Sequence, residues 1–471
     1  MTMDNNKEKL HVAIFPWLAY GHLMPFFQVA KFLAQKGHRI SYISTPKNIR
    51  RLPQLPADLL SSNLFRFVQL ALPHVDGLPL EAESTSELPI QKVPYLKKAY
   101  DLLQLPLTHF LQNSDVNWII LDFASYWLPS VASQLGVNSV YFSIFNATTC
   151  SFAGPPSELM GGRRQKPEDF TVVPDWIDYP SNVAFKLHEI VSHQDCMDSA
   201  VSDFQRTGIT IRDCRAFAVR SCPEFEPEAF GLLSRLLQKP VLPVGLLPPT
   251  MQETASGDEK WQVFKDWLDN KKEKSVIYVA LGTEVTLSQK LMHELAYGLE
   301  KSGFSFIWVV KNRPLVEGEM GPHLIPKGFE DLVSGRSLVW RDWAPQLRIL
   351  AHPSVGGFLT HSGWSSVIEA LGLGRVLILL SGASSDTGLV ARLMHSKRVG
   401  LEIERNEQDG SFTSESVAES IRRVMVSPEG DTLRANAWAM REVFGNVDLH
   451  NKYLNEFTHF IESETASTRS V

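Results

Sequence analysis

Short apolar runs recur along the first half of the chain, and helical patterns separate them. The runs are residues 10–15 (LHVAIF), 39–43, 65–70, 118–121 and 140–142. Apolar runs of this length without polar alternation are typical of strands whose two faces are both covered by helices. The first half of the chain is therefore predicted to form a doubly wound parallel sheet.

The same pattern starts again after residue 260. Its strand-like runs are residues 275–281, 304–309, 338–340, 357–360 and 376–380. Between the two halves lies the proline-rich segment 239–249, followed by the polar segment 251–260. Such a composition is typical of an interdomain linker. We therefore predict two α/β domains with a cleft between them.

Composition narrows the setting and the partners. Apolar residues make up 44% of the chain and charged residues 21%, and 46 Lys and Arg against 52 Asp and Glu give a net charge of -6. This balance argues against a nucleic-acid partner. The apolar runs are too short to span a membrane, and the amino terminus lacks the apolar stretch of a signal peptide. The four cysteines form no CxxC pair, so we expect no structural zinc site, and a cytoplasmic location is the simplest interpretation, with secretion as the alternative.

Several common catalytic motifs are absent from the sequence. There is no GxxxxGK[ST] loop, no GxSxG elbow and no HExxH pair, which argues against P-loop phosphotransferases, α/β-hydrolases and zinc peptidases. No GxGxxG follows either opening strand, so a nicotinamide-dependent dehydrogenase is weakly supported.

Two polar residues directly follow predicted strands, where ligands bind in such sheets. His22, after Gly21, follows the first run, and an imidazole there suits proton abstraction at neutral pH. Asp122 follows the run 118–121, and its carboxylate could accept the second ring N–H of His22. The structural alternatives are a histidine that caps the helix start and an aspartate that caps a helix.

A longer motif begins at Trp343. It comprises Trp343-Ala344-Pro345-Gln346, His352-Pro353, residues 356–361 (GGFLTH), Gly363-Trp364, Ser366 and Glu369. This spacing closely resembles the signature box of plant secondary-product UDP-glycosyltransferases, glycosyltransferase family 1. The resemblance extends over essentially the whole chain, and His22 and Asp122 fall where that family places its catalytic dyad.

The resemblance implies a fold and a domain plan. The fold would be GT-B, with two facing Rossmann-like domains and a cleft between them. Residues 1–247 would bind the acceptor, residues 248–262 would be the linker, and residues 263–447 would bind the nucleotide sugar. The C-terminal helix, residues 448–463, would cross back to the first domain, and we expect a monomer.

The resemblance also implies a donor site without a metal or cofactor. Trp343 would stack on the uracil ring. Ala344, Gln346 and Glu369 would hold the nucleoside. A helix start beside His361 would bind the diphosphate, because helix N-termini attract anions. The residues expected around the phosphates are Gly282, Thr283, His361, Gly363, Trp364, Ser365 and Ser366. The structural alternative is a tryptophan-rich surface turn with core glycines.

The end of the box departs from the family pattern. The family commonly has an Asp-Gln pair that holds the sugar hydroxyls, and here one inserted residue sets Asp386-Thr387 opposite it. Without the insertion, Ser385-Asp386 would take that place. Thr387 is shorter than Gln, so the donor stays open between UDP-glucose, our first choice, and UDP-rhamnose. Ser365 also replaces the usual Asn.

Residues 11–38 and 95–104 look most like the sugar-elongating branch of that family, which adds a sugar to one already present on a flavonoid, diterpenoid or triterpenoid. This resemblance implies an inverting transfer of a sugar to a hydroxyl of a plant glycoside, such as a terpenoid or flavonoid glycoside. His22 would act as the general base and Asp122 as its partner. Aromatic residues would line the acceptor site or belong to the core: Tyr20, Phe123, Tyr126, Trp127 and Phe145. The alternative from another class is a non-catalytic homologue that binds a glycoside or a nucleotide.

Overall fold

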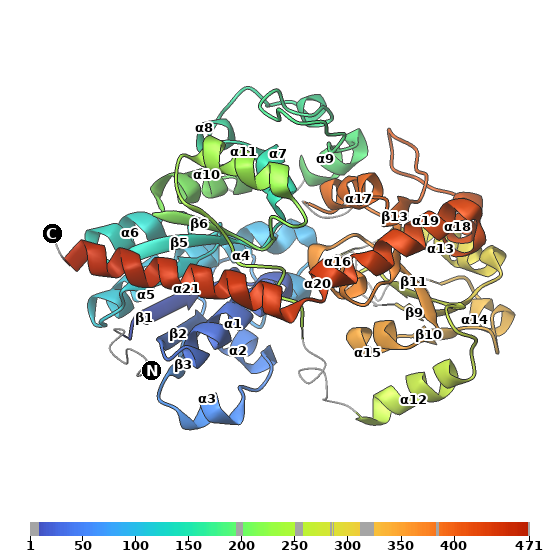
Figure 1. Ribbon diagram of the computed structural model, residues 1–471, viewed down its shortest axis with the longest axis horizontal. Helices are drawn as coiled ribbons and strands as arrows, with labels where there is room; N and C mark the ends of the chain where they lie inside the picture. The colour runs from blue at the N-terminus through green and yellow to red at the C-terminus, as the bar shows by residue number, and fades with distance from the viewer. Residues whose placement is uncertain are drawn as a thin grey trace, which may run out of the picture. The chain divides into compact units, whose positions relative to one another are not determined.

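The computed structural model describes residues 9–194, 201–249, 258–282, 285, 287–310, 325–382 and 386–469 of the 471-residue chain. The chain divides into two compact units (Figure 1). Unit 1 comprises Met1–Gln165, Cys196–Leu247 and Asp448–Val471, and unit 2 comprises Lys166–Asp195 and Pro248–Val447.

Unit 1 is built on a fully parallel sheet with the order β3-β2-β1-β4-β5-β6-β7. Its strands are β1 His11–Phe15, β2 Arg39–Ser44, β3 Phe65–Gln69, β4 Trp118–Leu121, β5 Asn138–Ser143, β6 Ala216–Val219 and β7 Val241–Pro243. The strand order reverses at the β1–β4 pair, where Phe15 lies opposite Leu121. In sheets of this kind ligands bind beyond the carboxyl ends of the strands at such a reversal.

Helices cover both faces of this sheet, as the continuous apolar runs predict. Successive residues of β1 point to opposite faces: Ala13 and Phe15 belong to one buried cluster, and Val12 and Ile14 belong to the other. The helices of unit 1 are α1 Tyr20–Gln35, α2 Pro46–Arg51, α3 Ala57–Ser61, α4 Val93–Asp101, α5 Gln104–Gln112, α6 Leu128–Gln134, α7 Ala147–Ala153, α8 Pro156–Leu159, α10 Asp203–Asp213, α11 Pro227–Leu237 and α21 Val447–Arg469, with 3-10 turns at Thr85–Glu87 and Ile90–Lys92.

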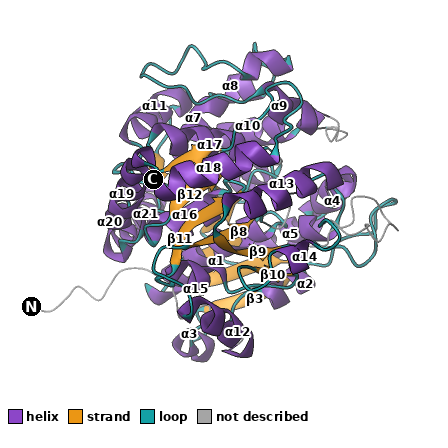
Figure 2. Cartoon of the chain, turned by 90° about the vertical axis from the view of Figure 1, so that its right-hand side faces the viewer, coloured by secondary structure: helices purple, strands orange, loops and turns teal. Residues whose placement is uncertain are grey.

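Unit 2 repeats this plan with the order β10-β9-β8-β11-β12-β13, again fully parallel. Its strands are β8 Val276–Ala280, β9 Ser305–Val309, β10 Leu338–Trp340, β11 Val355–Thr360, β12 Val376–Leu379 and β13 Gly400–Glu402. The helices are α9 Leu187–Gln194, α12 Asp258–Asp269, α13 Gln289–Ser302, α14 Phe329–Leu332, α15 Gln346–Ala351, α16 Trp364–Gly372, α17 Thr387–Ser396, α18 Ser414–Val426, α19 Pro428–Ala439 and α20 Arg441–Phe444, with a 3-10 turn at Pro167–Phe170. Figure 2 shows the orange strands between purple helices. The order reverses at β8–β11, where Thr360 lies opposite Ala280.

The last helix, α21, completes the core of unit 1 and is drawn in red in Figure 1. Its side chains Leu454, Phe457 and Ile461 join the buried cluster that contains Val12 and Ile14. On β4, the indole Nε1 of Trp118 donates to Thr465 Oγ1 at 2.7 Å. Residues from the end of the sequence thus cover one face of the first sheet.

The segment Lys166–Asp195 lies within the range 1–247 that the sequence assigns to the first domain, yet it groups with unit 2. Buried hydrogen bonds hold it there: Arg392 Nε, on α17, donates to the carbonyl oxygen of Ala184 at 2.9 Å. Because the segment contains no strand, its place depends on side chains more than two hundred residues away. The sequence pattern could not show such partners.

Three short strands were not predicted from the sequence, namely β6, β7 and β13. Strand β7 corrects the interpretation of residues 239–249 as linker, because Leu242 pairs with Ala218 of β6. Pro243 ends β7, and proline is tolerated there because β7 is an edge strand. The other strands begin and end within two residues of the predicted runs.

Candidate catalytic pair and nucleotide-binding site

The two candidate catalytic residues of unit 1 meet at the strand reversal. His22 lies near the start of α1, which follows β1, and Asp122 directly follows β4. His22 Nδ1 is 2.7 Å from Asp122 Oδ2, although the two residues are a hundred positions apart in the sequence. The prediction that neighbouring strands bring these side chains together is therefore met by the geometry.

The surroundings of Asp122 fix the role of its carboxylate. The residue is 1% exposed, and its oxygens accept hydrogen bonds from the backbone N–H groups of Trp17 at 3.0 Å and Phe123 at 2.8 Å. Because a carboxylate accepts, the bond to His22 places the imidazole proton on Nδ1 and makes Nε2 the basic nitrogen. The alternatives in which His22 or Asp122 caps a helix do not apply. The N-cap residues of α1 and α6 are Ala19 and Trp127, and neither helix start has a side-chain cap.

The five aromatic candidates divide into two groups. Phe123 and Phe145 lie beside the imidazole of His22, with ring centroids 5.8 and 6.3 Å away. Tyr20 is 46% exposed at the start of α1. Trp127, by contrast, is buried in the core cluster of Phe15. Tyr126 packs against that cluster beneath the guanidinium of Arg206, 4.8 Å from its ring centroid. Of the two interpretations, acceptor site or core, the core therefore describes the positions of Trp127 and Tyr126.

In unit 2, His361 lies at the equivalent strand reversal. It follows β11, and Gly282 follows β8. A Cβ on Gly282 would lie 2.6 Å from His361 Cε1, and one on Gly363 would lie 2.5 Å from Nε2. The ring thus occupies space that any side chain at these glycines would take. Gly363 is the N-cap of α16 and supplies no side-chain cap, and a helix N-terminus is a kind of site that attracts an anion.

His361 is held in its neutral form. Loss of hydration on burial lowers the pKa of its imidazole to about 4. Its Nδ1 is buried and has no hydrogen-bond partner among the described residues. A neutral imidazole can donate one N–H to a phosphate oxygen.

A polar cluster lies next to this helix start. Gln346 Nε2 on α15 donates to Glu369 Oε2 at 2.9 Å and to Ser366 Oγ at 3.2 Å, both on α16. Trp343 precedes α15 and is 49% exposed, so its indole face is accessible to a flat ring. Ala344, beside it, is buried. The cluster thus combines a carboxylate, an amide and an exposed indole, which are groups able to bind a nucleoside.

The remaining donor candidates lie as follows. Trp364 is buried and packs against Phe444 with ring centroids 5.9 Å apart, so its indole serves the core. Ser365 is in the first turn of α16. Asp386 immediately precedes α17, and Thr387, its first residue, is 1% exposed. Thr283 and Ser385 lie outside the described residues.

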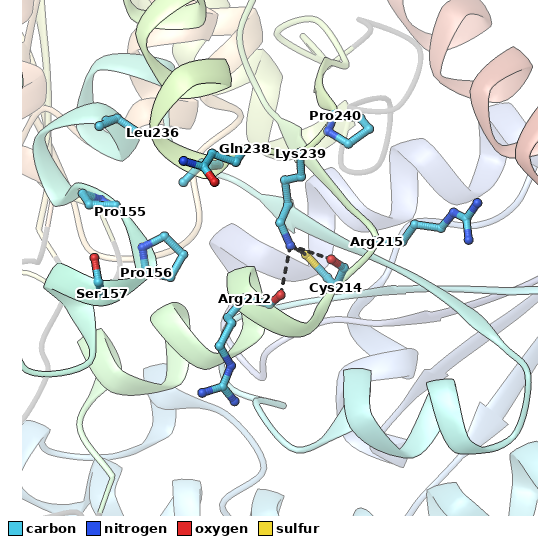
Figure 3. Close-up of a pocket in the computed structure, with 11 residues that line it drawn as sticks. Pro155, Pro156, Ser157, Arg212, Cys214, Arg215, Leu236, Gln238, Lys239 and Pro240 are labelled. Atoms are coloured by element: carbon cyan, nitrogen blue, oxygen red, sulfur yellow. Dashed lines mark hydrogen bonds between the residues drawn. The ribbon is translucent and has the colours of Figure 1, made fainter.

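A hollow on unit 1 lies elsewhere, at the amino ends of β6 and β7 (Figure 3). Its cations are already paired: Lys239 Nζ donates to the carbonyl oxygen of Cys214 at 2.6 Å, Arg212 pairs with Asp213, and Arg215 pairs with Glu464. His22 and Asp122 follow the carboxyl ends of β1 and β4, so they lie at the opposite end of the parallel strands. The hollow is therefore not part of the candidate catalytic site.

Among the residues that the structure describes, no group of three or more His, Cys, Asp or Glu side chains is placed to hold a metal ion. Within the same residues, no helix combines the length and the apolar composition needed to cross a bilayer.

Comparison with known proteins identifies the family. Residues 249–431 match the family model described as UDP-glucoronosyl and UDP-glucosyl transferase. The chain is 48% identical to UDP-glycosyltransferase 91C1 of Arabidopsis thaliana, over 99% of this chain and 100% of that protein. The chain belongs to the plant UDP-glycosyltransferase family.

Two further relatives of this UDP-glycosyltransferase locate its branch and its fold. It is 33% identical to an anthocyanidin 3-O-glucoside 2''-O-glucosyltransferase of Ipomoea nil, over 98% of this chain and 99% of that one. The crystal structure of Arabidopsis thaliana UGT89C1 complexed with UDP-L-rhamnose is similar with a TM-score of 0.73, at 26% identity, covering 97% of this chain and 99% of that one. The predicted GT-B fold and the resemblance to the sugar-elongating branch are thus confirmed.

Sequence reasoning missed some of the residues that shape the UDP-glycosyltransferase site. The backbone N–H of Trp17 helps to orient Asp122, yet nothing in the residue type indicates it. Ser381, which follows β12, is held by Glu189 from a distant segment, with Ser381 Oγ donating to Glu189 Oε1 at 2.9 Å. The partner of Ser381 lies 192 positions away in the sequence and could be found only in the folded chain.

Proposed function

We propose that this UDP-glycosyltransferase transfers a sugar, glucose in the first instance, from a UDP-sugar to a hydroxyl of a small-molecule glycoside, with inversion. Terpenoid and flavonoid glycosides are the acceptors we expect. One observation carries the proposal: the 2.7 Å contact between His22 Nδ1 and the buried carboxylate of Asp122. It gives the imidazole the tautomer and the orientation that a general base needs.

In the proposed reaction, His22 Nε2 takes the proton of the acceptor hydroxyl. The acceptor oxygen forms a bond to the anomeric carbon of the sugar, and the bond from that carbon to the β-phosphate oxygen breaks. UDP leaves with the electron pair. Asp122 stabilises the imidazolium that forms, because its carboxylate is adjacent to the ring.

Unit 2 supplies the groups that would hold UDP. Trp343 would stack on the uracil ring, and Glu369, oriented by Gln346, would accept the ribose hydroxyls. The helix start at Gly363 and the neutral imidazole of His361 would donate to the diphosphate and stabilise it as a leaving group. Asp386 remains the candidate contact for the sugar hydroxyls. Thr387 is buried, which weighs against a direct contact between the Thr387 side chain and the sugar.

The acceptor would lie against Phe123 and Phe145, since both rings adjoin His22. Exposed Tyr20 would extend this apolar surface. Flat or polycyclic scaffolds suit aromatic walls of this kind. A glycoside acceptor is further favoured by the relative that acts on an anthocyanidin 3-O-glucoside.

The test is a UDP-release assay with UDP-glucose, UDP-rhamnose, UDP-xylose and UDP-galactose against a set of plant glycosides. We expect acceptor-dependent UDP release with one donor and a loss of about 10²–10⁴ in rate for His22→Ala. His11→Ala is the matched control, because His11 pairs with Asp115 at the other end of β1, with 2.8 Å between Nδ1 and Oδ1. This control should retain transfer.

The outcomes separate the alternatives. Activity with UDP-rhamnose alone would show that the donor is UDP-rhamnose, our second choice. Thr387, which stands where the family usually has Gln, favours this donor. UDP binding without release from any donor and acceptor would indicate a non-catalytic binding homologue. Equal loss in His22→Ala and His11→Ala would contradict the assignment of the base.

A further inference from the structure

Unit 2 contains a buried cluster of charged residues that the proposed reaction does not use. At its centre is Glu189 on α9, which is 3% exposed. Its Oε2 accepts from the backbone N–H of Lys186 at 2.8 Å and pairs with Arg392 on α17. Arg392 also pairs with Glu402 of β13, with 2.5 Å between Nη1 and Oε2. The cluster thus ties the segment Lys166–Asp195 to two elements of unit 2.

Glu189 also lies close to Ser381 and to the first turn of α17, and these two places flank Asp386, the candidate sugar contact. Ser381 Oγ donates to Glu189 Oε1 at 2.9 Å. In the first turn of α17, a Cβ on Gly388 would lie 2.3 Å from Glu189 Oε2. Glycine at this position lets the helix backbone approach the carboxylate. Glu189 therefore holds Ser381 by a hydrogen bond, lies close to the first turn of α17, and pairs with Arg392 of the same helix.

A guanidinium holds Ser381 from another direction. Arg405 donates to the carbonyl oxygen of Ser381, and its Nε donates to the carbonyl oxygen of Gly410 at 2.6 Å. A Cβ on Gly382 would lie 2.6 Å from Arg405 Nη1. The main chain at Ser381 and Gly382 is thus held by Glu189 through the hydroxyl and by Arg405 through the carbonyl.

The electrostatics keep the Glu189 carboxylate ionised. Burial by itself raises its pKa, but the positive charge and hydrogen bonds of Arg392 outweigh burial and hold the pKa below its usual value. The carboxylate of Glu189 accepts hydrogen bonds from Lys186, Ser381 and Arg392. A buried carboxylate with these partners is suited to fixing its neighbours.

We propose that Glu189 is a positioning residue for the donor sugar. This inference rests on the proposed function, because it assumes that Asp386 contacts the sugar of a UDP-sugar. Asp386 immediately precedes α17, so Glu189 sets the position of Asp386 by holding that helix through Arg392 and beside Gly388. The nucleoside candidates Gln346 and Glu369 lie on other helices, α15 and α16. Loss of Glu189 therefore affects recognition of the sugar and spares recognition of UDP.

The test compares Glu189→Gln with Glu402→Gln. Both variants neutralise a carboxylate that pairs with Arg392, and Glu402 has no role in the proposed sugar contacts. For Glu189→Gln we expect a rise of about tenfold in the KM for the preferred UDP-sugar and a changed ratio of kcat/KM between UDP-glucose and UDP-rhamnose, since small displacements at a binding site have effects of at least this size. The Kd for UDP should change less than about twofold, which is under 0.5 kcal/mol. Glu402→Gln should leave the donor ratio unchanged.

Ser381→Ala is the second variant, and it keeps the proposal testable if Glu189→Gln does not fold. It removes the hydroxyl that joins Ser381 to Glu189, so it should change the donor ratio in the same direction and by less. Equal effects of Glu189→Gln and Glu402→Gln, an unchanged donor ratio in Ser381→Ala, or an equal weakening of UDP and UDP-sugar binding would overturn the proposal.

A binding measurement separates this inference from the proposed function. If the wild-type protein released no UDP from any donor, the proposed reaction would fail on that ground alone. Calorimetry would then compare the affinities of UDP and UDP-glucose without turnover. A selective loss of UDP-glucose affinity in Glu189→Gln would still support the positioning role, and parallel affinities would refute it.

Discussion

The buried imidazole of His361, which we propose contacts the donor, also affects the stability of unit 2. In the folded protein the pKa of His361 is lowered to about 4 by burial, and no described residue hydrogen-bonds to its Nδ1. In an unfolded chain a histidine has a pKa near 6.5. The unfolded state therefore binds the proton more tightly, and the folded state is stabilised above the unfolded pKa and loses that stability as the pH falls toward the folded pKa.

This linkage gives a pH prediction for a single residue. Between pH 7 and pH 5, His361 should lower the free energy of unfolding by about 2 kcal/mol, because only the unfolded state protonates the ring in that window. Urea unfolding of the wild type and His361→Gln at both pH values measures the effect. Carboxylates titrate in both proteins, so the difference between the two curves isolates His361. Parallel pH dependences would contradict the pKa shift.

At the scale of elements, both sheets place their candidate site residues by the same rule. His22 and Asp122 follow β1 and β4, and Gly282 and His361 follow β8 and β11. Each pair of strands is the point where its strand order reverses. The close approach of the two turns in unit 2 depends on Gly282, which has a φ of +76° and leaves room for the His361 ring.

Gly282→Ala tests that dependence, with Gly303→Ala as the matched control. Gly303 also has a positive φ, +81°, but a Cβ there would meet nothing within 4 Å. Both variants should lose about 1–2 kcal/mol of stability through backbone strain. Only Gly282→Ala should lose UDP affinity, by about tenfold or more, because its methyl group displaces His361. Calorimetric titration with UDP measures this, and equal UDP affinities in the two variants would show that the ring position is unimportant.

The elements also show what the sequence could predict. Runs such as Trp118–Leu121 are buried on both faces, so their composition alone identifies them as strands. Placing His22 and Asp122 after such runs was enough to predict their contact. Strand β7 was missed because an edge strand of three residues ending in proline has too few apolar positions to form a pattern.

Contacts between side chains far apart in the sequence were the other feature that could not be predicted. Trp127 and Trp364 were candidate ligand contacts because tryptophan is common in binding sites, yet both are buried against other aromatic rings. The grouping of Lys166–Asp195 with unit 2 depends on ion pairs such as Glu189 with Arg392, which are 203 positions apart. No local pattern carries that information.

At the scale of the whole molecule, each unit contains segments from both halves of the sequence. Unit 1 takes Asp448–Val471 from the end of the chain, and unit 2 takes Lys166–Asp195 from the first half. The core of the first sheet is therefore complete only when α21 is in place. Phe457, 1% exposed, fills part of that core together with Leu454 and Ile461.

Phe457→Ala should accordingly destabilise unit 1 by about 3–5 kcal/mol, the usual cost of removing a buried phenyl ring. Asn455→Ala, at an exposed position of the same helix, is the control and should have little effect. Because the residues proposed to bind UDP belong to unit 2, we expect heating to abolish acceptor-dependent UDP release in Phe457→Ala at a lower temperature than UDP binding. The two activities, followed against temperature in the intact chain, measure this separation. Their simultaneous loss would show that the units unfold as one and that α21 stabilises both.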